Sequence, residues 1–569
     1  MKIKEIEIEN FKSIKHEKII FPQSNILALV GPNNAGKSNI VKAINYILGD
    51  TWLNKSKLVI NDFYQKKMDN AIKIKIIFDN DFSIMFDSSG EEYPIYSDSN
   101  GQKINQWNLP VSFESTGSAK SDFPCTYLEA NRSVEKCLQF KSWELMGKIA
   151  KSFNEKVVDK KMILEQKFDE IINIFDEVKE FKQFKDDFVN YFEEMQSDSP
   201  YKLKVDFRAF TPLNYFRSIN ILANDSTIND SYDTDVIELG DGNRNLILFA
   251  LFRSYAKNFK QEARGILAIE EPEIYMHPQA QKHLYSIFKE IVKDSNIQII
   301  FTTHSANFVE TEEFYQIGLV SKDADKGTKV RLVNKDLFVK FCKLTGVPDS
   351  KTTVGNISEF YATTSNKQLN EAFFSNYAIL VEGDTEELTI PCYLKKNGID
   401  CDSKGISIIG VKGKNQIPKY WRLFKIFGIR VLPVIDSDNG SNEKDSNKNI
   451  CNCFNIALDL ITQNVDICKI IDSAIKIGEK EIKQKILVIE KDFEFSIKSD
   501  IQKFCQENKL ECKYDEIENE ARQLIKPIND SQKGQIARFI AKKICDIYTG
   551  FKPVIIQKIE NILKENKIA

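Results

Sequence analysis

Residues 26–38 read ILALVGPNNAGKS, and the amphipathic run 39–48 follows them. An apolar strand, a glycine-rich loop and a helix in this order match the pattern G-x-x-x-x-G-K-[ST], in which backbone N–H groups hold phosphates. The Lys37 ammonium would neutralise phosphate charge, and the Ser38 hydroxyl can bind Mg²⁺. The stretch therefore predicts an α/β domain that binds ATP with Mg²⁺. The residues predicted to contact the nucleotide are Gly31, Asn33, Asn34, Ala35, Gly36, Lys37, Ser38 and Asn39.

Two further apolar runs end in polar residues that suit ATP hydrolysis. The run 266–269 ends in Glu270 and Glu271, and carboxylates at a strand end beside a phosphate loop can hold Mg²⁺ and orient the attacking water. We assign metal binding to Glu270 and the role of general base to Glu271. The run 298–301 leads into His304, which can contact the terminal phosphate. The alternatives are two carboxylates that favour a helix start and a histidine with a structural role.

Acidic residues also follow two apolar runs in the last third of the chain. The run 378–381 ends in Glu382, with Glu386 four residues further on, and a second apolar run ends in Asp436 and Asp438. The carboxyl ends of parallel strands open on one edge of a sheet, so these carboxylates should converge. Converging carboxylates stay ionised only around cations, which predicts Mg²⁺ or Mn²⁺, and two such ions about 4 Å apart can hydrolyse a phosphodiester. Alternatively, Glu386 complements a helix N-terminus and Asp438 is a turn residue.

The order of these motifs resembles the OLD nucleases, in which an ABC-type ATPase head precedes a Toprim domain. Residues 270–273, followed by His277 and Pro278, are similar to the OLD branch in particular. The resemblance implies an α/β fold: an ABC-type ATPase head with a helical insertion, followed by a Toprim α/β domain with additional helices. Such heads dimerise around ATP, and a glycine-bearing signature of one subunit closes the nucleotide site of the other. The candidate signature carries Gly240 and Gly242, departs from the form Leu-Ser-Gly-Gly-Gln, and is alternatively a helix-entry turn.

The resemblance also adds two residues to the metal site. Glu494, in Asp-Phe-Glu after an apolar strand, matches a further acidic motif of OLD nucleases, and Lys533 matches a lysine that stabilises developing negative charge. From its residue type alone, Lys533 would be taken as a solvated charge. Glu271 completes the predicted catalytic residues. The metal ligands that the resemblance implies are Glu382, Glu386, Asp436, Asp438 and Glu494.

The length of 569 residues predicts several domains. Helical spacing of apolar residues among many Lys and Glu predicts an insertion that either packs on the chain's own surface or serves dimerisation. A strand is expected at 203–207 after it. The predicted segments are an N-terminal ATPase part at 1–141, the helical insertion at 142–200, a C-terminal ATPase part at 201–345, a linker at 346–371 and a Toprim nuclease domain at 372–569.

The second half of the Toprim domain is expected to be mostly helical. Residues 439–449 are rich in Gly, Ser and Asn and predict a loop. Helical material should follow to the C-terminus, interrupted by one apolar strand at 486–489.

Bulk composition restricts the classes of partner. The formal net charge is −3, so local lysines and metal ions, and not a global basic field, would have to attract nucleic acid. The 11 cysteines are an odd number without a regular framework, and the chain starts without an apolar signal segment. No run of 18 apolar residues is found. These features predict a cytoplasmic protein with no membrane partner.

We therefore predict an ATP-regulated, divalent-metal-dependent DNA endonuclease or nickase that acts as a homodimer or a larger homo-oligomer. The resemblance implies a bacterial anti-phage effector, similar to the nuclease subunit of the Gabija system and to retron-associated OLD effectors. Its partner would then be a helicase, or a reverse transcriptase with its noncoding RNA or DNA. The main alternative is an ATPase of the SMC or RecF kind that clamps DNA without cutting it. Primase or topoisomerase activity fits the Toprim motifs but lacks an evident zinc module or strand-passage domain.

Overall fold

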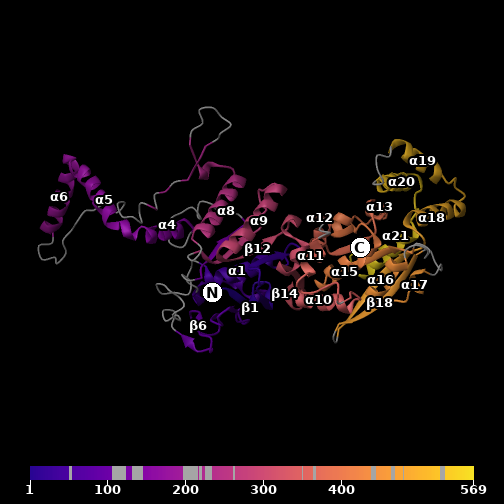
Figure 1. The fold of residues 1–569 in the computed structure, drawn as a ribbon, viewed down its shortest axis with the longest axis horizontal. Coiled ribbons are helices and arrows are strands. Elements are labelled where there is room, and N and C mark those ends of the chain that lie inside the picture. Colours follow the sequence, from indigo (N-terminus) through magenta and orange to yellow (C-terminus); the bar gives the residue numbers. More distant parts are fainter. Residues whose placement is uncertain are drawn as a thin grey trace. The chain divides into compact units, whose positions relative to one another are not determined.

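The computed structural model describes most of the chain (Figure 1). The predicted strand at 203–207 and the predicted metal ligand Asp438 lie outside the described residues. The described residues are 1–49, 54–104, 123–130, 145–195, 216, 219, 221–224, 233–259, 263–348, 350–362, 367–437, 444–462, 468–477, 480–525 and 532–568.

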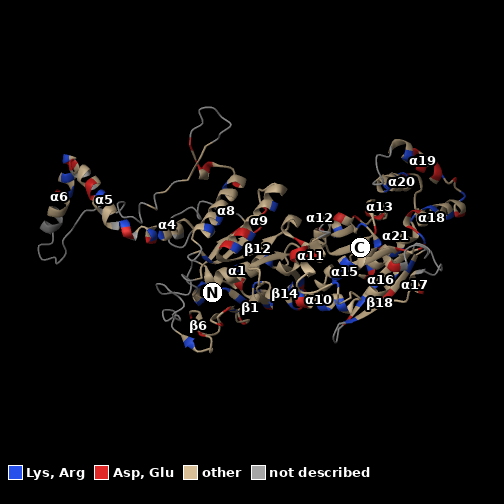
Figure 2. Ribbon diagram, in the orientation of Figure 1, with Lys and Arg blue, Asp and Glu red and all other residues tan. Residues whose placement is uncertain are grey.

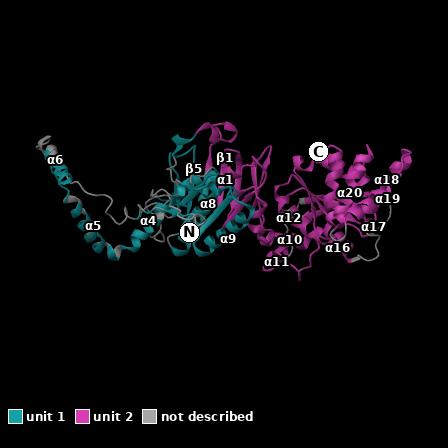
Figure 3. Ribbon diagram, turned by 90° about the horizontal axis from the view of Figure 1, so that it is seen from above, with its two compact units in different colours: residues 1–4, 41–58, 74–301 teal, residues 5–40, 59–73, 302–569 magenta. Residues whose placement is uncertain are grey.

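The chain forms two compact units, coloured separately in Figure 3. Both units combine segments that are distant in the sequence. Unit 1 comprises residues 1–4, 41–58 and 74–301, and unit 2 comprises residues 5–40, 59–73 and 302–569. Helix α1 (Lys37–Leu48) contains the residues at which the chain passes from unit 2 to unit 1.

Unit 1 contains strands and helices, among which two strands pair in parallel and two helices pack against each other. The strands are β4 (Lys73–Phe78), β5 (Ser83–Asp87), β6 (Ile95–Ser97), β7 (Lys103–Ile104), β8 (Cys125–Leu128), β9 (Leu222–Ala223), β10 (Thr234–Asp235), β11 (Arg264–Glu270) and β12 (Asn296–Thr303). The helices are α4 (Leu145–Lys156), α5 (Lys161–Asp176), α6 (Lys179–Met195), α8 (Asp241–Asn258) and α9 (Pro278–Asp294). Strand β11 pairs in parallel with β8 and is buried from Gly265 onward, as expected for a strand covered on both faces. Helices α8 and α9 pack through Phe249 and Phe288, whose ring centroids are 5.5 Å apart.

Helices α4, α5 and α6 occupy much of the predicted insertion. Figure 2 shows basic and acidic residues interspersed along them. Large apolar side chains on α5 and α6 are nevertheless exposed, including Met162, Ile174 and Phe184. A role of these helices in dimerisation stays a prediction.

The first part of unit 2 positions the phosphate loop. Strands β1 (Ile3–Phe11), β2 (Ile14–Ile20), β14 (Gly327–Leu332), β13 (Ile317–Asp323) and β3 (Ile26–Val30) lie side by side in that order. The pairings are antiparallel except that of β13 with β3, which is parallel. Helix α10 (Lys335–Leu344) follows β14, and the short helices α11 (Ile357–Ala362) and α12 (Lys367–Glu371) lie within the segment predicted as a linker.

The second part of unit 2 is a five-stranded sheet in the order β16-β15-β17-β19-β18. Its strands are β15 (Tyr377–Val381), β16 (Ile406–Gly410), β17 (Val431–Asp436), β18 (Cys468–Ile477) and β19 (Lys480–Ile489). Pairing is parallel except between β18 and β19. The surrounding helices are α13 (Asp384–Lys396), α14 (Cys401–Lys404), α15 (Ile417–Ile426), α16 (Lys444–Phe454), α17 (Asp459–Thr462), α18 (Phe493–Glu507), α19 (Tyr514–Leu524), α20 (Lys533–Ile547) and α21 (Val554–Glu565).

Two expectations for this region are wrong. The strand expected at 486–489 is confirmed as the end of the longer β19, but a second strand, β18, stands where helix was expected. Helix α16 begins at Lys444, inside the segment expected to be a loop. Within the described ranges, no helix is both long enough and apolar enough to cross a lipid bilayer.

Candidate active site

The phosphate loop in unit 2 is folded back on itself. Gly31 and Gly36 have φ angles of 144° and 105°, which favour glycine, and Asn34 is at 61°. The buried Lys37 ammonium donates to the carbonyl oxygens of Gly31 at 2.8 Å and of Pro32 at 3.0 Å. An anionic phosphate is a stronger partner for an ammonium than a carbonyl is, so Lys37 can exchange these bonds for a nucleotide phosphate.

Side chains of β14 and of the turn between β1 and β2 contact the loop. The Thr328 hydroxyl on β14 donates to the Ala35 carbonyl at 2.9 Å and shares a hydrogen bond of 2.7 Å with Ser13. The Asn39 amide donates to the Ser13 hydroxyl at 2.7 Å. A Cβ at Gly36 would lie 2.1 Å from the Thr328 hydroxyl, so this close approach requires glycine. Sequence reasoning assigned Asn39 to the nucleotide and missed Thr328 and Ser13, which belong to no motif.

The remaining predicted ATP-site residues of unit 2 differ in exposure. Asn33 is exposed and Ser38 is half-buried. His304 is exposed and follows β12, where Thr302 and Thr303 are fully buried.

In unit 1, Glu270 ends β11 in a buried, polar setting. Its carboxylate accepts a hydrogen bond of 2.8 Å from the Tyr127 hydroxyl and lies 3.9 Å from the Lys42 ammonium on α1. Burial raises the pKa of Glu270, and the Tyr127 hydrogen bond and the Lys42 charge oppose that rise. A bound cation would favour the ionised carboxylate in the same way. Glu271 follows in a turn with a φ of 47°.

The candidate signature glycines lie at the start of α8. Gly240 is the N-cap residue, and Gly242 is in the first turn. A Cβ at Gly242 would lie 2.8 Å from the Tyr275 carbonyl oxygen, so glycine allows α8 to pack against the turn that follows β11. This contact explains Gly242 within one subunit, and its role towards a partner's nucleotide stays a prediction.

The two acidic strand tips of unit 2 meet. β15 and β17 are parallel neighbours, with Leu380 beside Pro433. The backbone N–H of Asp436 donates to the Glu382 carboxylate at 2.8 Å, and Asp436 is 8% exposed. The structure thus brings Glu382 and Asp436 to one edge, as parallel strands require.

Two further carboxylates from helix starts reach the same edge. Glu386, 6% exposed, accepts from the Gly383 backbone N–H at 3.2 Å, and Glu494 accepts from the Thr385 hydroxyl at 3.1 Å. Burial and then the charges of Glu382 and Glu494 raise the pKa of Glu386 to about 7. Glu382, Glu386 and Glu494 therefore lie close enough to repel one another.

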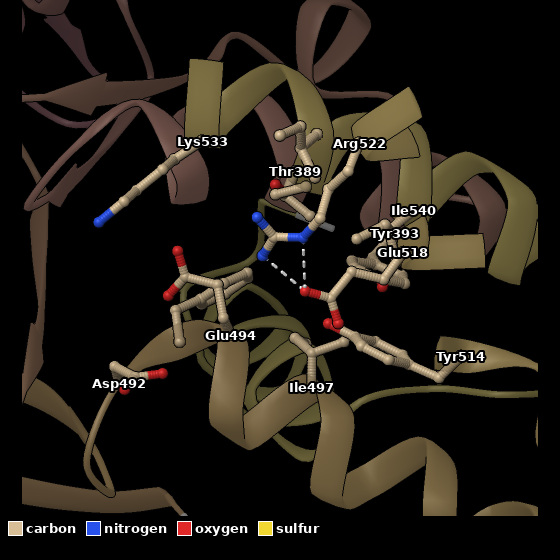
Figure 4. A pocket seen from close by; sticks show the side chains of 13 residues that line it. Thr389, Tyr393, Asp492, Glu494, Ile497, Tyr514, Glu518, Arg522, Lys533 and Ile540 are labelled. Atoms are coloured by element: carbon tan, nitrogen blue, oxygen red, sulfur yellow. Dashed lines mark hydrogen bonds and ion pairs between the residues drawn. The ribbon is translucent and has the colours of Figure 1, made fainter. Parts of the chain in front are cut away.

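Lys533 reaches the acidic edge through tight helix packing. A Cβ at Gly534 would lie 2.9 Å from the Asp384 carbonyl oxygen, so glycine lets the start of α20 touch the start of α13. Lys533, Glu494 and Asp492 line one pocket, and Figure 4 shows their side chains together on one side of it. The contact places Lys533 in the lining of the same pocket as Glu494.

The chemistry of this edge suits a divalent cation. Carboxylate oxygens are the ligands that Mg²⁺ and Mn²⁺ prefer. The raised pKa of Glu386 comes first from burial and then from the charges of Glu382 and Glu494, and a bound cation would offset both. The predicted ligand Asp438 is not among the described residues. Among those that are, no three acidic, His or Cys side chains have the spacing of a formed metal site.

Comparison with known proteins identifies both domains. A family model for the AAA ATPase domain matches residues 1–116 and 116–309, and a model for the TOPRIM domain of overcoming-lysogenization-defect-like proteins matches residues 373–438. The chain belongs to the AAA ATPase-domain family and also carries an OLD-like TOPRIM domain. It is an enzyme that joins an ATPase domain to a TOPRIM nuclease domain, and the expected α/β fold is confirmed.

Three relatives with similar sequences are named nucleases. An OLD nuclease of Thermus scotoductus is 24% identical, over 77% of this chain and 82% of the relative. The Old nuclease of Escherichia phage P2 is 25% identical, over 78% of both chains. The endonuclease GajA of Bacillus cereus is 26% identical over 45% of this chain and 38% of its own.

The acidic edge of unit 2 also has a buried lysine that the sequence did not indicate. Lys414, 3% exposed, donates its ammonium to the backbone carbonyl of Asp436. The preceding N–H of Gly413 donates to the Glu382 carbonyl at 2.8 Å. The turn after β16 thereby ties the ends of β15 and β17 together. A lysine beside a glycine in a loop looks solvated in the sequence, so nothing there indicates this role.

Proposed function

We propose that this protein is an ATP-regulated DNA endonuclease or nickase that uses Mg²⁺ or Mn²⁺ at its TOPRIM edge. The observation that carries the proposal is the hydrogen bond between Asp436 and Glu382, because it brings together two acidic motifs that lie 54 residues apart. Glu386 and Glu494 add charge to the same edge. Such a cluster of carboxylates is unfavourable unless it binds cations. Two relatives of the chain are also named nucleases.

The residues of this chain take distinct parts in the proposed reaction. Glu382, Glu386, Asp436 and Glu494, with Asp438, would hold two divalent ions, which when bound supply an activated water and neutralise the leaving oxygen. Lys533 would bind a nonbridging phosphate oxygen of the scissile group and stabilise its charge in the transition state. The Lys414 contact would hold Asp436 in place during this step.

The ATPase domain would control access to the nuclease. Lys37 and the loop N–H groups would bind the phosphates, with Ser38 and Glu270 holding Mg²⁺ and Glu271 acting as general base. His304 would contact the terminal phosphate. Gly240 and Gly242 would close a partner's site, which makes the active form a homodimer or a larger homo-oligomer.

The biological setting that we propose is bacterial defence against phage, in the cytoplasm. Support comes from the similarity to the P2 Old nuclease and to GajA. A helicase, or a reverse transcriptase with its noncoding RNA or DNA, is the proposed partner class.

The test incubates the full chain with supercoiled and linear DNA in Mg²⁺ or Mn²⁺. Asp436→Asn should reduce cutting by at least about 100-fold, because even residues behind a metal's ligands contribute tenfold to 100-fold. Lys37→Ala should abolish ATP hydrolysis and change only the response of cutting to ATP. DNA binding without cutting under every condition would instead favour an ATP-driven clamp.

A further inference from the structure

A pocket of about 430 Å³ adjoins the acidic edge (Figure 4). Side chains of α13, α18, α19 and α20 line it. Glu494 and Lys533 belong both to this pocket and to the proposed metal and phosphate site. Its volume lies in the range of about 300–1,000 Å³ that small-molecule sites have. Any group that enters it is therefore attached to, or next to, whatever occupies the acidic edge.

The inner wall of the pocket is aromatic and aliphatic. Tyr393 and Tyr514 contribute rings, and Ile497, Ile536 and Ile540 contribute aliphatic side chains. Such a wall offers flat apolar contact to a planar ring and nothing to a hydrated ion. This wall therefore suits neither a metal ion nor free phosphate.

The Tyr393 hydroxyl is a buried polar group that lacks a partner. Tyr393 is 1% exposed, and its hydroxyl finds no hydrogen-bond partner among the described residues. Buried hydroxyls are nearly always paired, so an unpaired one in a pocket wall indicates a ligand atom that completes it. That atom must be polar and must belong to a group that also packs against apolar walls.

Charged groups stand at the other side of the pocket. On α19, the Arg522 guanidinium donates to the Glu518 carboxylate at 2.7 Å and 3.1 Å. The Arg522 side chain is 62% exposed, so its planar face stays open. Guanidinium planes and tyrosine rings are the groups on which proteins stack unpaired bases.

We propose that this pocket receives one unpaired nucleobase of the DNA strand whose phosphate lies between Glu494 and Lys533. The inference rests on the proposed nuclease function and adds a substrate class to it: DNA with an unpaired base beside the cleavage point. A base stacked inside a duplex cannot enter this pocket, whereas a bulged, frayed or extruded base can. The Tyr393 hydroxyl and the Glu518 carboxylate would then meet polar atoms at the edge of the base.

Binding to the full chain tests this proposal without cleavage. The probes are two fluorescent duplexes of equal length, one fully paired and one with a single unpaired thymidine, measured by anisotropy with Ca²⁺ in place of Mg²⁺. Wild type should bind the second duplex about tenfold more tightly, which corresponds to about 1.4 kcal/mol. Ala537→Phe fills the pocket and should bring the two affinities within twofold of each other. Gln535→Phe, which adds the same ring to α20 at an exposed position outside the lining, should keep the wild-type ratio.

A second variant removes only the unpaired hydroxyl. Tyr393→Phe should fold at least as stably as wild type and lower the preference for the unpaired thymidine about threefold. Equal affinity of wild type for both duplexes, or an unchanged ratio in Ala537→Phe, overturns the pocket proposal. Cleavage in Mg²⁺ is scored separately: cutting of paired DNA without a preference refutes the pocket alone, and a binding preference without any cutting refutes the nuclease proposal alone.

Discussion

The backbone N–H of Asp436 donates a hydrogen bond of 2.8 Å to the carboxylate of Glu382. The bond connects the ends of two neighbouring parallel strands, so Glu382 contributes both to the local structure and to the charge of the edge. Gln and Ala replacements separate these two contributions. Gln keeps an acceptor oxygen and loses the charge, whereas Ala loses both.

Glu382→Gln should therefore fold like wild type and fail to cut DNA. We expect an unfolding temperature within about 2 °C of wild type, since a change of 1 kcal/mol shifts such temperatures by a few degrees. Cleavage in Mg²⁺ should fall by at least about 100-fold. Glu382→Ala should lose cleavage and also about 1–3 kcal/mol of stability, because it removes the carboxylate that accepts the hydrogen bond from the Asp436 N–H. Normal cutting by the Gln variant would remove Glu382 from the metal site.

Glu386 makes the stability of the metal-free protein depend on pH. Its pKa of about 7 lies above the ordinary value of 4.5, so the folded state binds more protons than the unfolded state between these values. The stabilisation is complete below pH 4.5 and is lost as the pH rises through about 7. The unfolding temperature measured in EDTA should fall over this window, and Glu386→Gln should flatten the fall. Glu359→Gln, at an exposed position on α11, should keep the wild-type slope.

Gly534 allows the contact that places Lys533. An alanine Cβ there would lie 2.9 Å from the Asp384 carbonyl oxygen, so α20 must shift away from α13. Gly534→Ala should reduce cleavage about 10-fold to 100-fold, in the range expected when a supporting residue of a metal site is lost. Gly355→Ala, whose Cβ would meet its nearest neighbour at 3.8 Å, should cut normally. The test compares the cleavage rates of Gly534→Ala and Gly355→Ala at saturating Mg²⁺.

Lys414 should contribute to stability even without metal. Lys414→Met keeps most of the packing but leaves the Asp436 carbonyl without its ammonium donor. Urea unfolding in EDTA should show a loss of about 1–3 kcal/mol. Lys404→Met, at an exposed position on α14, is the matched control and should change little. An unaltered unfolding curve for Lys414→Met would show that the turn after β16 holds the strand ends without this lysine.

The convergence of Glu382 and Asp436 could be predicted because topology alone determines it. Apolar runs that end in acidic residues match β15 and β17, and parallel strands place their carboxyl ends on one edge. Strand β18 could not be recognised in the same way. Asp472, Ser473 and Ala474 separate its buried Ile471 and Ile475, so no apolar run or strict alternation marks it, and it is a strand because it pairs with β19 at the sheet edge.

Residues that act through packing or burial left no sequence signal. Lys533 was found only through the family resemblance, because its position depends on how closely α20 approaches α13 at Gly534. Lys414 and Thr328 hold backbone carbonyls, and neither residue type predicts such a contact. The nucleobase pocket likewise forms from helices that are distant in sequence, so only the fold reveals it.

Arg422 offers a test of whether the ATPase domain controls the nuclease. On α15, its buried guanidinium donates to the hydroxyl of Thr345 at 2.7 Å and to the carbonyl of the same residue at 2.5 Å, at the end of α10. Helix α10 follows β14, which carries the Thr328 contact to the phosphate loop, and α15 follows the turn that holds Lys414. Arg422 thus lies on a continuous path through unit 2 between the two sites.

Arg422→Met should weaken this connection and leave both sites intact. We expect ATP hydrolysis and ATP-free DNA cutting within about threefold of wild type, and a ratio of cutting with and without ATP that approaches one. The variant should also lose about 1.5–3 kcal/mol of stability, the usual contribution of hydrogen bonds to charged groups. Lys340→Met, which removes an exposed ammonium on α10, should retain the wild-type ATP ratio. A wild-type ATP ratio in Arg422→Met would mean that ATP acts on cleavage by another route, such as association of subunits.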